Sequence, residues 1–192
     1  MAMLAITQNP LTAAAASAST YKIISSKSKI EFTVMRGQNI GARGSFSGIS
    51  GSIKFDKAKP ALGNVTAKIP ITSLDSGVAV RDNDLIGPKY FDCQKFPSAT
   101  FQSKKLKVLK SGKLLLEGNL SLHGFNKPVQ IFMNQPPKLV HSKKGGPRFL
   151  NASGTSSLDH SDFGLSLLPL HPDGAVRINP KIALKITIVA TE

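Results

Sequence analysis

The chain has 192 residues, of which 41% are hydrophobic and 19% charged, and its formal net charge is +14. This composition excludes a disordered chain, a collagen and a coiled coil, and the length predicts one domain. No run of 18 apolar residues occurs, so no transmembrane helix is expected. The single cysteine, Cys93, excludes an intrachain disulfide framework. The positive charge predicts attraction to anions such as nucleic acid or anionic lipid headgroups.

Residues 1–20 contain no charged residue, and they include the small-residue pattern Ala16-Ser17-Ala18, which is typical of a secretory cleavage site. They lack the basic region that opens a signal peptide, and Asn9-Pro10 interrupts their apolar stretch. We therefore interpret residues 1–20 as either a signal-peptide remnant or a disordered tail, and residues 21–192 as a single folded domain.

From Tyr21 onward, hydrophobic and polar residues alternate with a period of two, which is the pattern of strands with one buried face. The clear runs cover residues 30–35, 52–56, 65–71, 114–123 and 181–188. Turn signals separate the runs, among them Ser111-Gly112 and Asn126-Lys127-Pro128. Short strands at this spacing, without long helical patterns, predict an antiparallel β-sandwich or β-barrel.

Residues 76–92 break this alternation. Asp82, Asn83 and Asp84 favour a helix N-terminus, and Gly87-Pro88 would end the helix. We predict a short helical segment that crosses between two strands. Arg81 and Asp82 are interpreted as a helix cap and an ion pair that hold this segment in place, and contact of Arg81 with a ligand is the alternative.

The inward positions of the predicted strands are mostly aliphatic, and Gly118 and Ala67 are expected to leave space. A barrel of about eight strands is either packed or just wide enough for one slender ligand. Arg36 continues the inward phase of the 30–35 run, and an inward guanidinium needs a partner. That partner is either the head group of a ligand or an acidic residue of the 75–92 segment.

Catalytic and metal-binding patterns are absent from the sequence. The histidines and Cys93 do not have zinc-ligand spacing, and no Gly-x-Ser-x-Gly motif occurs. We therefore expect no catalytic residue, no metal and no cofactor. His123 is predicted to stabilise a turn, and His160, between two aspartates, to form a hydrogen bond at the surface.

Lysines gather around two predicted hairpins. We interpret them as a solvated face, and docking on an anionic membrane surface is the functional alternative. Nucleic acid is a poor candidate partner because few aromatic residues stand between the basic ones. These basic residues are Lys104, Lys105, Lys107, Lys110 and Lys113 in the first group and Lys138, Lys143, Lys144 and Arg148 in the second.

Several motifs, spread over roughly residues 21–190, together resemble the YceI-like family. The motifs are Arg81-Asp82-Asn83-Asp84-Leu85 followed by Tyr90-Phe91-Asp92, then the blocks at 96–103, 118–129 and 161–165. The resemblance implies an all-β fold, an extended eight-stranded antiparallel lipocalin-like barrel, in a periplasmic or secreted polyisoprenoid-binding protein. Family members often have His at the positions of Arg36 and Asp84, and Arg at that of His160. The preference for a head group therefore does not carry over.

From these observations we predict non-catalytic binding, transport or storage of a long hydrophobic chain, which would be a polyisoprenoid, an isoprenoid quinone or a fatty-acid derivative. The alternative is a basic barrel that binds an anionic polymer or a membrane surface through its lysine face, and a homodimer stays open. The predicted ligand-binding residues are Phe32, Val34, Arg36, Ile53, Phe55, Ile69, Arg81, Tyr90, Phe91, Phe101, Leu120, Leu122, Ile131, Phe163, Leu184 and Ile186. Among them, Arg36 and Arg81 are expected to meet the polar head of the ligand.

Overall fold

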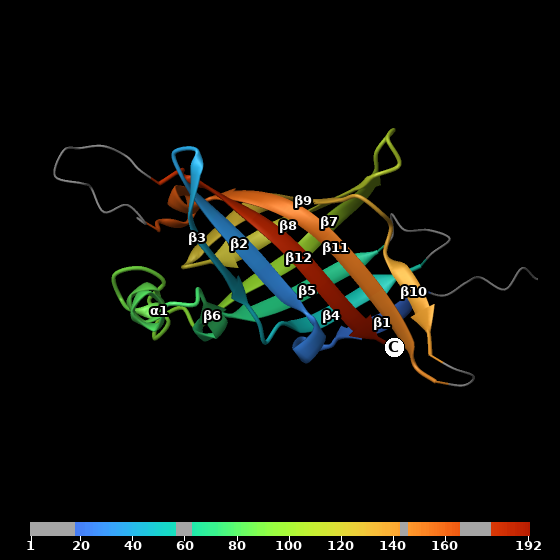
Figure 1. Cartoon of the computed structure of the whole chain (residues 1–192). Coiled ribbons are helices and arrows are strands. Elements are labelled where there is room, and N and C mark those ends of the chain that lie inside the picture. Colours follow the sequence, from blue (N-terminus) through green and yellow to red (C-terminus); the bar gives the residue numbers. More distant parts are fainter. Residues whose placement is uncertain (1–17, 57–62, 143–145, 166–177) are drawn as a thin grey trace, which may run out of the picture.

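A computed structural model describes residues 18–56, 63–142, 146–165 and 178–192. Residues 1–17, most of the predicted signal-peptide remnant or tail, lie outside this part of the chain. The alternating segments form strands that wrap into an elongated barrel with α1 at one end (Figure 1). The strands are β1 (Ser19–Ile23), β2 (Lys29–Arg36), β3 (Asn39–Phe46), β4 (Ser50–Phe55), β5 (Asn64–Pro70), β6 (Leu74–Asp75), β7 (Ser98–Val108), β8 (Leu114–Leu122), β9 (Phe125–Met133), β10 (Lys138–His141), β11 (Arg148–Asp159) and β12 (Lys181–Thr191).

The barrel closes through antiparallel pairing alone. Eight strands form the ring, in the order β1-β4-β5-β7-β8-β9-β11-β12, and β12 pairs back with β1. This confirms the predicted eight-stranded antiparallel barrel. Closure satisfies the backbone hydrogen bonds that an open sheet would leave exposed at its edges.

Strand β12 is long enough to pair with two successive segments of the chain. Near its C-terminal end it pairs with β1, and its first half pairs with β2, from Ile182 opposite Val34 to Thr187 opposite Lys29. The 3₁₀ turn η1 (Ser25–Lys27) separates β1 from β2. The Ser28 hydroxyl donates a hydrogen bond to the Val189 carbonyl at 3.2 Å, and this bond ties the turn to β12. β2 and β3 therefore extend the wall beyond β1 and β4.

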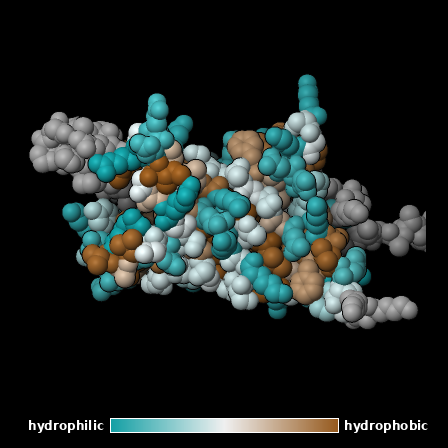
Figure 2. Space-filling view, in the orientation of Figure 1, coloured by the Kyte–Doolittle hydropathy of each residue, from teal (hydrophilic) through white to brown (hydrophobic). Residues whose placement is uncertain are grey.

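The inward-facing apolar side chains form the core, as the period of two predicts. Leu114, Leu116 and Phe101 are buried together between β7 and β8, and Ile49, Ile69 and Ile71 form another buried cluster. Seen from outside, the barrel is mostly hydrophilic, with hydrophobic residues in separate patches (Figure 2). No described helix is long and apolar enough to cross a membrane.

The predicted crossing helix is present as α1 (Ala79–Ile86), and it begins three residues before Asp82. Asp82 therefore lies in the first turn rather than at the cap, where its charge favours the positive end of the helix dipole. The helix ends at Gly87, whose N–H donates to the Asp84 carbonyl at 3.2 Å. Gly87-Pro88 thus ends the helix as predicted.

The turn predicted at Asn126-Lys127-Pro128 is wrong, because these residues lie inside β9. The chain reverses instead at His123 and Gly124, whose φ angles are 50° and 80°. Two consecutive positive φ values are the geometry of a tight β-hairpin turn. Proline has no backbone N–H to donate to a neighbouring strand. Pro128 is tolerated in β9 because β9 pairs with β11 only at Phe132, opposite Thr155, so no hydrogen bond is lost on that side.

Candidate functional site: an apolar cavity inside the barrel

The barrel interior holds a cavity of about 370 Å³ at the end where α1 crosses. Its wall is mostly aliphatic and aromatic, and it includes side chains from β2, β8 and β12 and from the α1 segment. A second cavity of about 140 Å³ lies further along the interior. The polar side chains in the wall of the first cavity are Ser76, Arg81, Asp84, Tyr90 and His160.

The two cavities meet at one girdle of aliphatic side chains. Five residues line both cavities, and each comes from a different strand: β2, β5, β8, β11 and β12. The two cavities therefore adjoin at this girdle, and together they form the apolar space of the barrel. We call these residues the girdle: Ile30, Ile69, Leu120, Leu158 and Leu184.

Fifteen of the sixteen predicted ligand-binding residues line this space. Whether they contact a ligand stays a prediction. The first cavity is lined by Phe32, Val34, Ile69, Arg81, Tyr90, Phe91, Leu120, Leu122, Phe163 and Leu184. The second cavity is lined by Ile53, Phe55, Phe101, Ile131 and Ile186, and again by Ile69, Leu120 and Leu184.

The inward position predicted for Arg36 is wrong. Arg36 is exposed and is absent from both cavity walls. The pairing of β12 with β2 ends at Val34, and the β2–β3 register is irregular between Val34 and Met35. Arg36 therefore lies at the tip of a hairpin that projects past the closed part of the barrel, where the guanidinium is hydrated.

Arg81 and Asp82 hold the entrance to α1 through a single serine. The Ser76 N–H donates to both carboxylate oxygens of Asp82 at 3.1 Å, and the Ser76 hydroxyl also donates to Asp82. Arg81 donates from Nε to the Ser76 hydroxyl and from Nη2 to the Ser76 carbonyl, both at 2.8 Å. We call this arrangement the Ser76 clamp. The pair holds the segment as predicted, but through Ser76 rather than as a helix cap and a direct ion pair, and Arg81 lines the first cavity as well.

His160 is buried, which contradicts the predicted surface hydrogen bond. It begins the 3₁₀ turn η4 (His160–Phe163), is 4% exposed, and lines the first cavity. Its Nδ1 lies 2.5 Å from the Leu165 carbonyl oxygen. Asp159, beside it, accepts two hydrogen bonds from Ser161, and these bonds lower the pKa of the Asp159 carboxyl. Asp159 therefore bonds to Ser161 of the turn, and the His160 imidazole bonds to Leu165 instead.

His123 stabilises its turn as predicted, and it also joins two separate elements. Its Nδ1 lies 3.0 Å from the Phe163 carbonyl oxygen in η4, and its ring packs edge-on against Phe96 with centroids 4.9 Å apart. The β8–β9 turn therefore braces the turn that carries His160.

Some wall residues were not revealed by the alternation. β11 contributes Ala152, Gly154, Ser156 and Leu158 at alternate positions, and these line the second cavity. The period of two is present in this strand, but small and polar residues occupy the inward phase. Small side chains on one strand leave space in a barrel of this size, so they contribute to the cavity as much as the aliphatic residues do.

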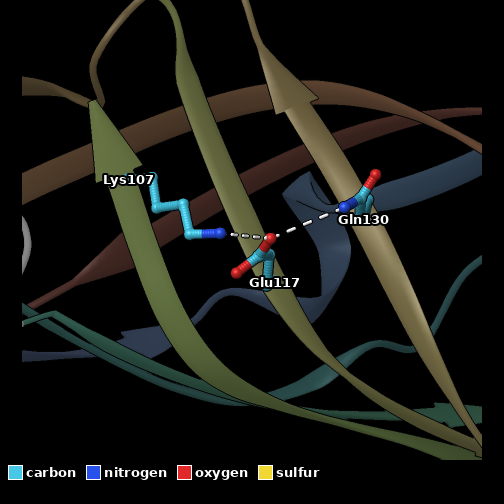
Figure 3. A network of polar contacts seen from close by, with 3 residues as sticks. All are labelled: Lys107, Glu117 and Gln130. Atoms are coloured by element: carbon cyan, nitrogen blue, oxygen red, sulfur yellow. Dashed lines mark hydrogen bonds and ion pairs between the residues drawn. The ribbon is translucent and has the colours of Figure 1, made fainter. Parts of the chain in front are cut away.

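Ion pairs are found on the outside of the barrel. On the outer face of β7, β8 and β9, Lys107 lies 2.7 Å from Glu117, and Gln130 donates to the same carboxylate at 3.5 Å (Figure 3). The ion pair lowers the pKa of Glu117. The β7–β8 hairpin projects at the end opposite α1 (Figure 1), and Lys104, Lys110 and the rest of its lysines there are solvated.

Among the described residues, no group of three or more His, Cys, Asp or Glu side chains is placed to hold a metal ion. Cys93 is half-buried against the cluster around Ile69, and burial, followed by the charge of Asp92, raises the pKa of its thiol. The site is therefore an apolar space with a few polar groups at the α1 end.

A closed eight-stranded antiparallel barrel around an apolar space is the architecture of small ligand-enclosing barrels such as lipocalins. The YceI-like domain model matches residues 21–190, and the chain belongs to that family.

Two similar proteins in sequence are UPF0312 proteins. A UPF0312 protein of Shewanella baltica is 32% identical over 124 residues, which are 65% of this chain and 64% of the relative. A UPF0312 protein of Yersinia pestis is 37% identical over 123 residues, or 62% of this chain and 63% of the relative. The match thus spans just under two thirds of the length of these relatives.

Solved structures share the fold. Burkholderia cenocepacia BcnA superposes with a TM-score of 0.72 at 22% identity, covering 88% of this chain and 99% of its own. A Campylobacter jejuni YCEI protein gives 0.67 at 25% identity, over 79% and 85% of the two chains. A polyisoprenoid binding domain from Saccharophagus degradans, implicated in plant cell wall breakdown, gives 0.61 at 14% identity over 88% and 97%.

Proposed function

We propose that this protein binds one long hydrophobic chain inside its barrel and carries or stores it without chemical change. The ligand would be a polyisoprenoid, an isoprenoid quinone or a fatty-acid derivative. The observation that carries the proposal is the elongated apolar space, with parts of about 370 and 140 Å³ that meet at the girdle. Its length suits a slender chain better than a compact molecule.

The physical gain is the transfer of apolar surface out of water. Each buried methylene contributes about 0.8 kcal/mol to binding. The wall has few polar groups, so the ligand needs to supply few hydrogen bonds. The girdle residues Leu120 and Leu184 would contact the middle of the chain. The polar residues of the α1 end would then meet its head group.

Family membership supports this proposal, and so does the shared fold with the polyisoprenoid binding domain of Saccharophagus degradans. Catalysis is not part of the proposal, and several polar residues at this end of the barrel hold the fold. Asp82 and Arg81 bond to Ser76, and His123 bonds to Phe163.

A periplasmic or secreted location is also part of the proposal. It is supported by the uncharged residues 1–20 with their Ala16-Ser17-Ala18 pattern. A carrier outside the cytoplasm would give a water-insoluble chain an aqueous route. Fractionation of cells that express the full chain tests this part, and retention of the protein with unprocessed residues 1–20 in the cytoplasm would refute it.

The girdle offers a direct test of binding inside the barrel. Replacement Leu184→Trp would fill space at the girdle where the two cavities adjoin, so we expect the affinity for a long prenyl alcohol such as geranylgeraniol to fall about tenfold or more, a loss of two or more buried methylenes. Ala183→Trp is the matched control, because Ala183 is the exposed neighbour on the same strand. Titration with the ligand, monitored by displacement of a fluorescent probe, measures the affinities of both variants.

The outcome separates an interior site from a surface site. Equal affinities in the wild type, Leu184→Trp and Ala183→Trp would place binding outside the barrel and refute the proposal. Thermal unfolding shows whether Leu184→Trp is folded. Leu120→Trp, on the opposite wall of the girdle, provides a second blocking variant.

A further inference from the structure

The polar end of the first cavity contains one buried atom whose hydrogen bonding is incomplete. His160 is 4% exposed, and among the described residues its Nε2 is buried and has no hydrogen-bond partner. The same side chain lines the first cavity. Most buried polar atoms in folded proteins have a partner, so an orphan of this kind next to a ligand space requires an explanation.

The other ring nitrogen fixes where the imidazole carries its hydrogen. Nδ1 lies 2.5 Å from the Leu165 carbonyl oxygen. A carbonyl oxygen only accepts hydrogen bonds, so Nδ1 must be the donor. In the neutral ring the hydrogen is then on Nδ1, and Nε2 presents a lone pair.

The backbone around His160 holds the ring in this orientation. The His160 N–H donates to the Pro180 carbonyl at 3.1 Å, and the Leu165 N–H donates to the His160 carbonyl at 3.1 Å. Gly164, with φ of 66°, closes the turn that brings Leu165 back to the imidazole. The acceptor is therefore part of a rigid turn rather than a mobile side chain, which is the condition for specific recognition.

Several hydrogen-bond donors in the cavity wall are already engaged, and the Tyr90 hydroxyl in the same wall can either donate or accept. Arg81 uses Nε and Nη2 on Ser76, and the Ser76 hydroxyl donates to Asp82. Asp84, which also lines the first cavity, is an acceptor when ionised. Two of the groups that surround the head of a ligand thus accept hydrogen bonds, and an acceptor can be satisfied only by a ligand that supplies a hydrogen.

We propose that His160 Nε2 accepts a hydrogen bond from a hydroxyl group at the head of the bound chain. The protein would therefore prefer hydroxyl-ended ligands, such as prenols, phenols and hydroquinones, over ethers with the same chain. This inference rests on the proposed function, because it names the head group that the same cavity selects. No covalent bond is formed or broken.

Two ligands that share the same chain and differ only in the head group test the inference. Geranylgeraniol carries a hydroxyl, and its methyl ether has the same chain without a donor. We expect the wild type to bind the alcohol about tenfold more tightly, the effect of one hydrogen bond to a buried acceptor. Titration calorimetry on the full chain gives both affinities.

Replacement His160→Asn is the matched variant. Its amide N–H can still donate to the Leu165 carbonyl, but it has no acceptor at the position of Nε2. We expect this variant to bind alcohol and ether equally, with the affinity for the ether unchanged. The nitrogen-15 signal of Nε2 in the wild type should shift with the alcohol and not with the ether.

Three results would overturn the inference in distinguishable ways. Equal binding of alcohol and ether to the wild type would show that His160 does not select the head. An equal loss of both affinities in a folded His160→Asn variant would assign His160 a structural role only. Binding of neither ligand by the wild type would instead refute the proposed function.

Discussion

The ring of Phe101 on β7 occupies the space beside Gly118 on β8. A Cβ built at Gly118 would lie 2.5 Å from Phe101 Cζ and 2.6 Å from Cε2. The space that the glycine was expected to leave in the barrel is therefore filled by an aromatic ring, and Gly118 shapes the wall of the second cavity indirectly. Phe101 lines that cavity because its ring can lie flat against the glycine.

Replacement Gly118→Ala should push the Phe101 ring into the second cavity. We expect a loss of about 1–3 kcal/mol in the free energy of unfolding, the usual cost of overpacking, with weaker binding of long ligands. Chemical denaturation and ligand titration measure the two effects. Ser121→Ala is the control, because Ser121 lies on the same strand and lines the polar groove outside the barrel. Unchanged stability and binding in Gly118→Ala would contradict the arrangement.

The Ser76 clamp predicts that α1 loosens when Asp82 loses its charge. Asp82→Asn weakens the hydrogen bonds from the Ser76 N–H and hydroxyl. Hydrogen bonds to a charged group contribute about 1.5–3 kcal/mol, so we expect destabilisation of that order and faster amide hydrogen exchange over residues 79–86. Asn83→Ala, an exposed neighbour on the same helix, should leave the exchange slow. Equal exchange in both variants would show that the clamp does not hold α1.

The Lys107–Glu117 pair predicts a small pH-dependent contribution to stability. Its hydrogen bond lowers the pKa of Glu117 in the folded state. A lowered folded pKa means that the contribution is present above the unfolded pKa, about 4.3 for Glu, and is lost as pH falls through the folded value. Glu117→Gln should therefore melt slightly below the wild type at neutral pH and together with it at strongly acid pH.

Salt and charge provide the controls for this prediction. High salt should shrink the difference at neutral pH, because exposed ion pairs are screened. Lys104→Gln also changes the surface charge by one, and it should show no comparable pH dependence. A Glu117→Gln effect that persists unchanged into acid would mean that the carboxylate charge is not its source.

The thiol of Cys93 should react slowly with maleimides. Burial, followed by the charge of Asp92, raises its pKa, and only the thiolate is nucleophilic. The reaction rate should therefore rise at higher pH than for an exposed cysteine. Ser111→Cys in a Cys93→Ser background supplies that reference at the exposed β7–β8 turn. Identical pH profiles for the two thiols would contradict the burial of Cys93.

The alternation of residues was sufficient to predict the strands and most of the cavity wall, but it left a sandwich or a barrel open, and the resemblance to the YceI-like family pointed to the barrel. Positions such as Phe32, Leu120 and Leu184 point inward because the period of a strand is two, and closure of the sheet makes that face an interior. The crossing helix was also predictable, because Gly87-Pro88 ends it and acidic residues favour its first turn.

Three features depended on pairing partners that a local pattern does not contain. Arg36 follows the inward phase, but β12 no longer pairs with β2 at that point. Pro128 signals a turn, yet β9 tolerates it because its far edge is almost unpaired there. His160 lies between two aspartates, but the turn to Leu165 takes its imidazole into the interior.

The central claim is that the barrel holds a hydrophobic chain, and extraction of the ligand tests it most directly. Protein expressed in its natural host would be purified without detergent, extracted with organic solvent, and the extract analysed by mass spectrometry. We expect one class of long prenyl or acyl lipid, close to one molecule per chain, that Leu184→Trp fails to retain. A barrel that is empty after purification and also takes up no added prenyl lipid would contradict the claim.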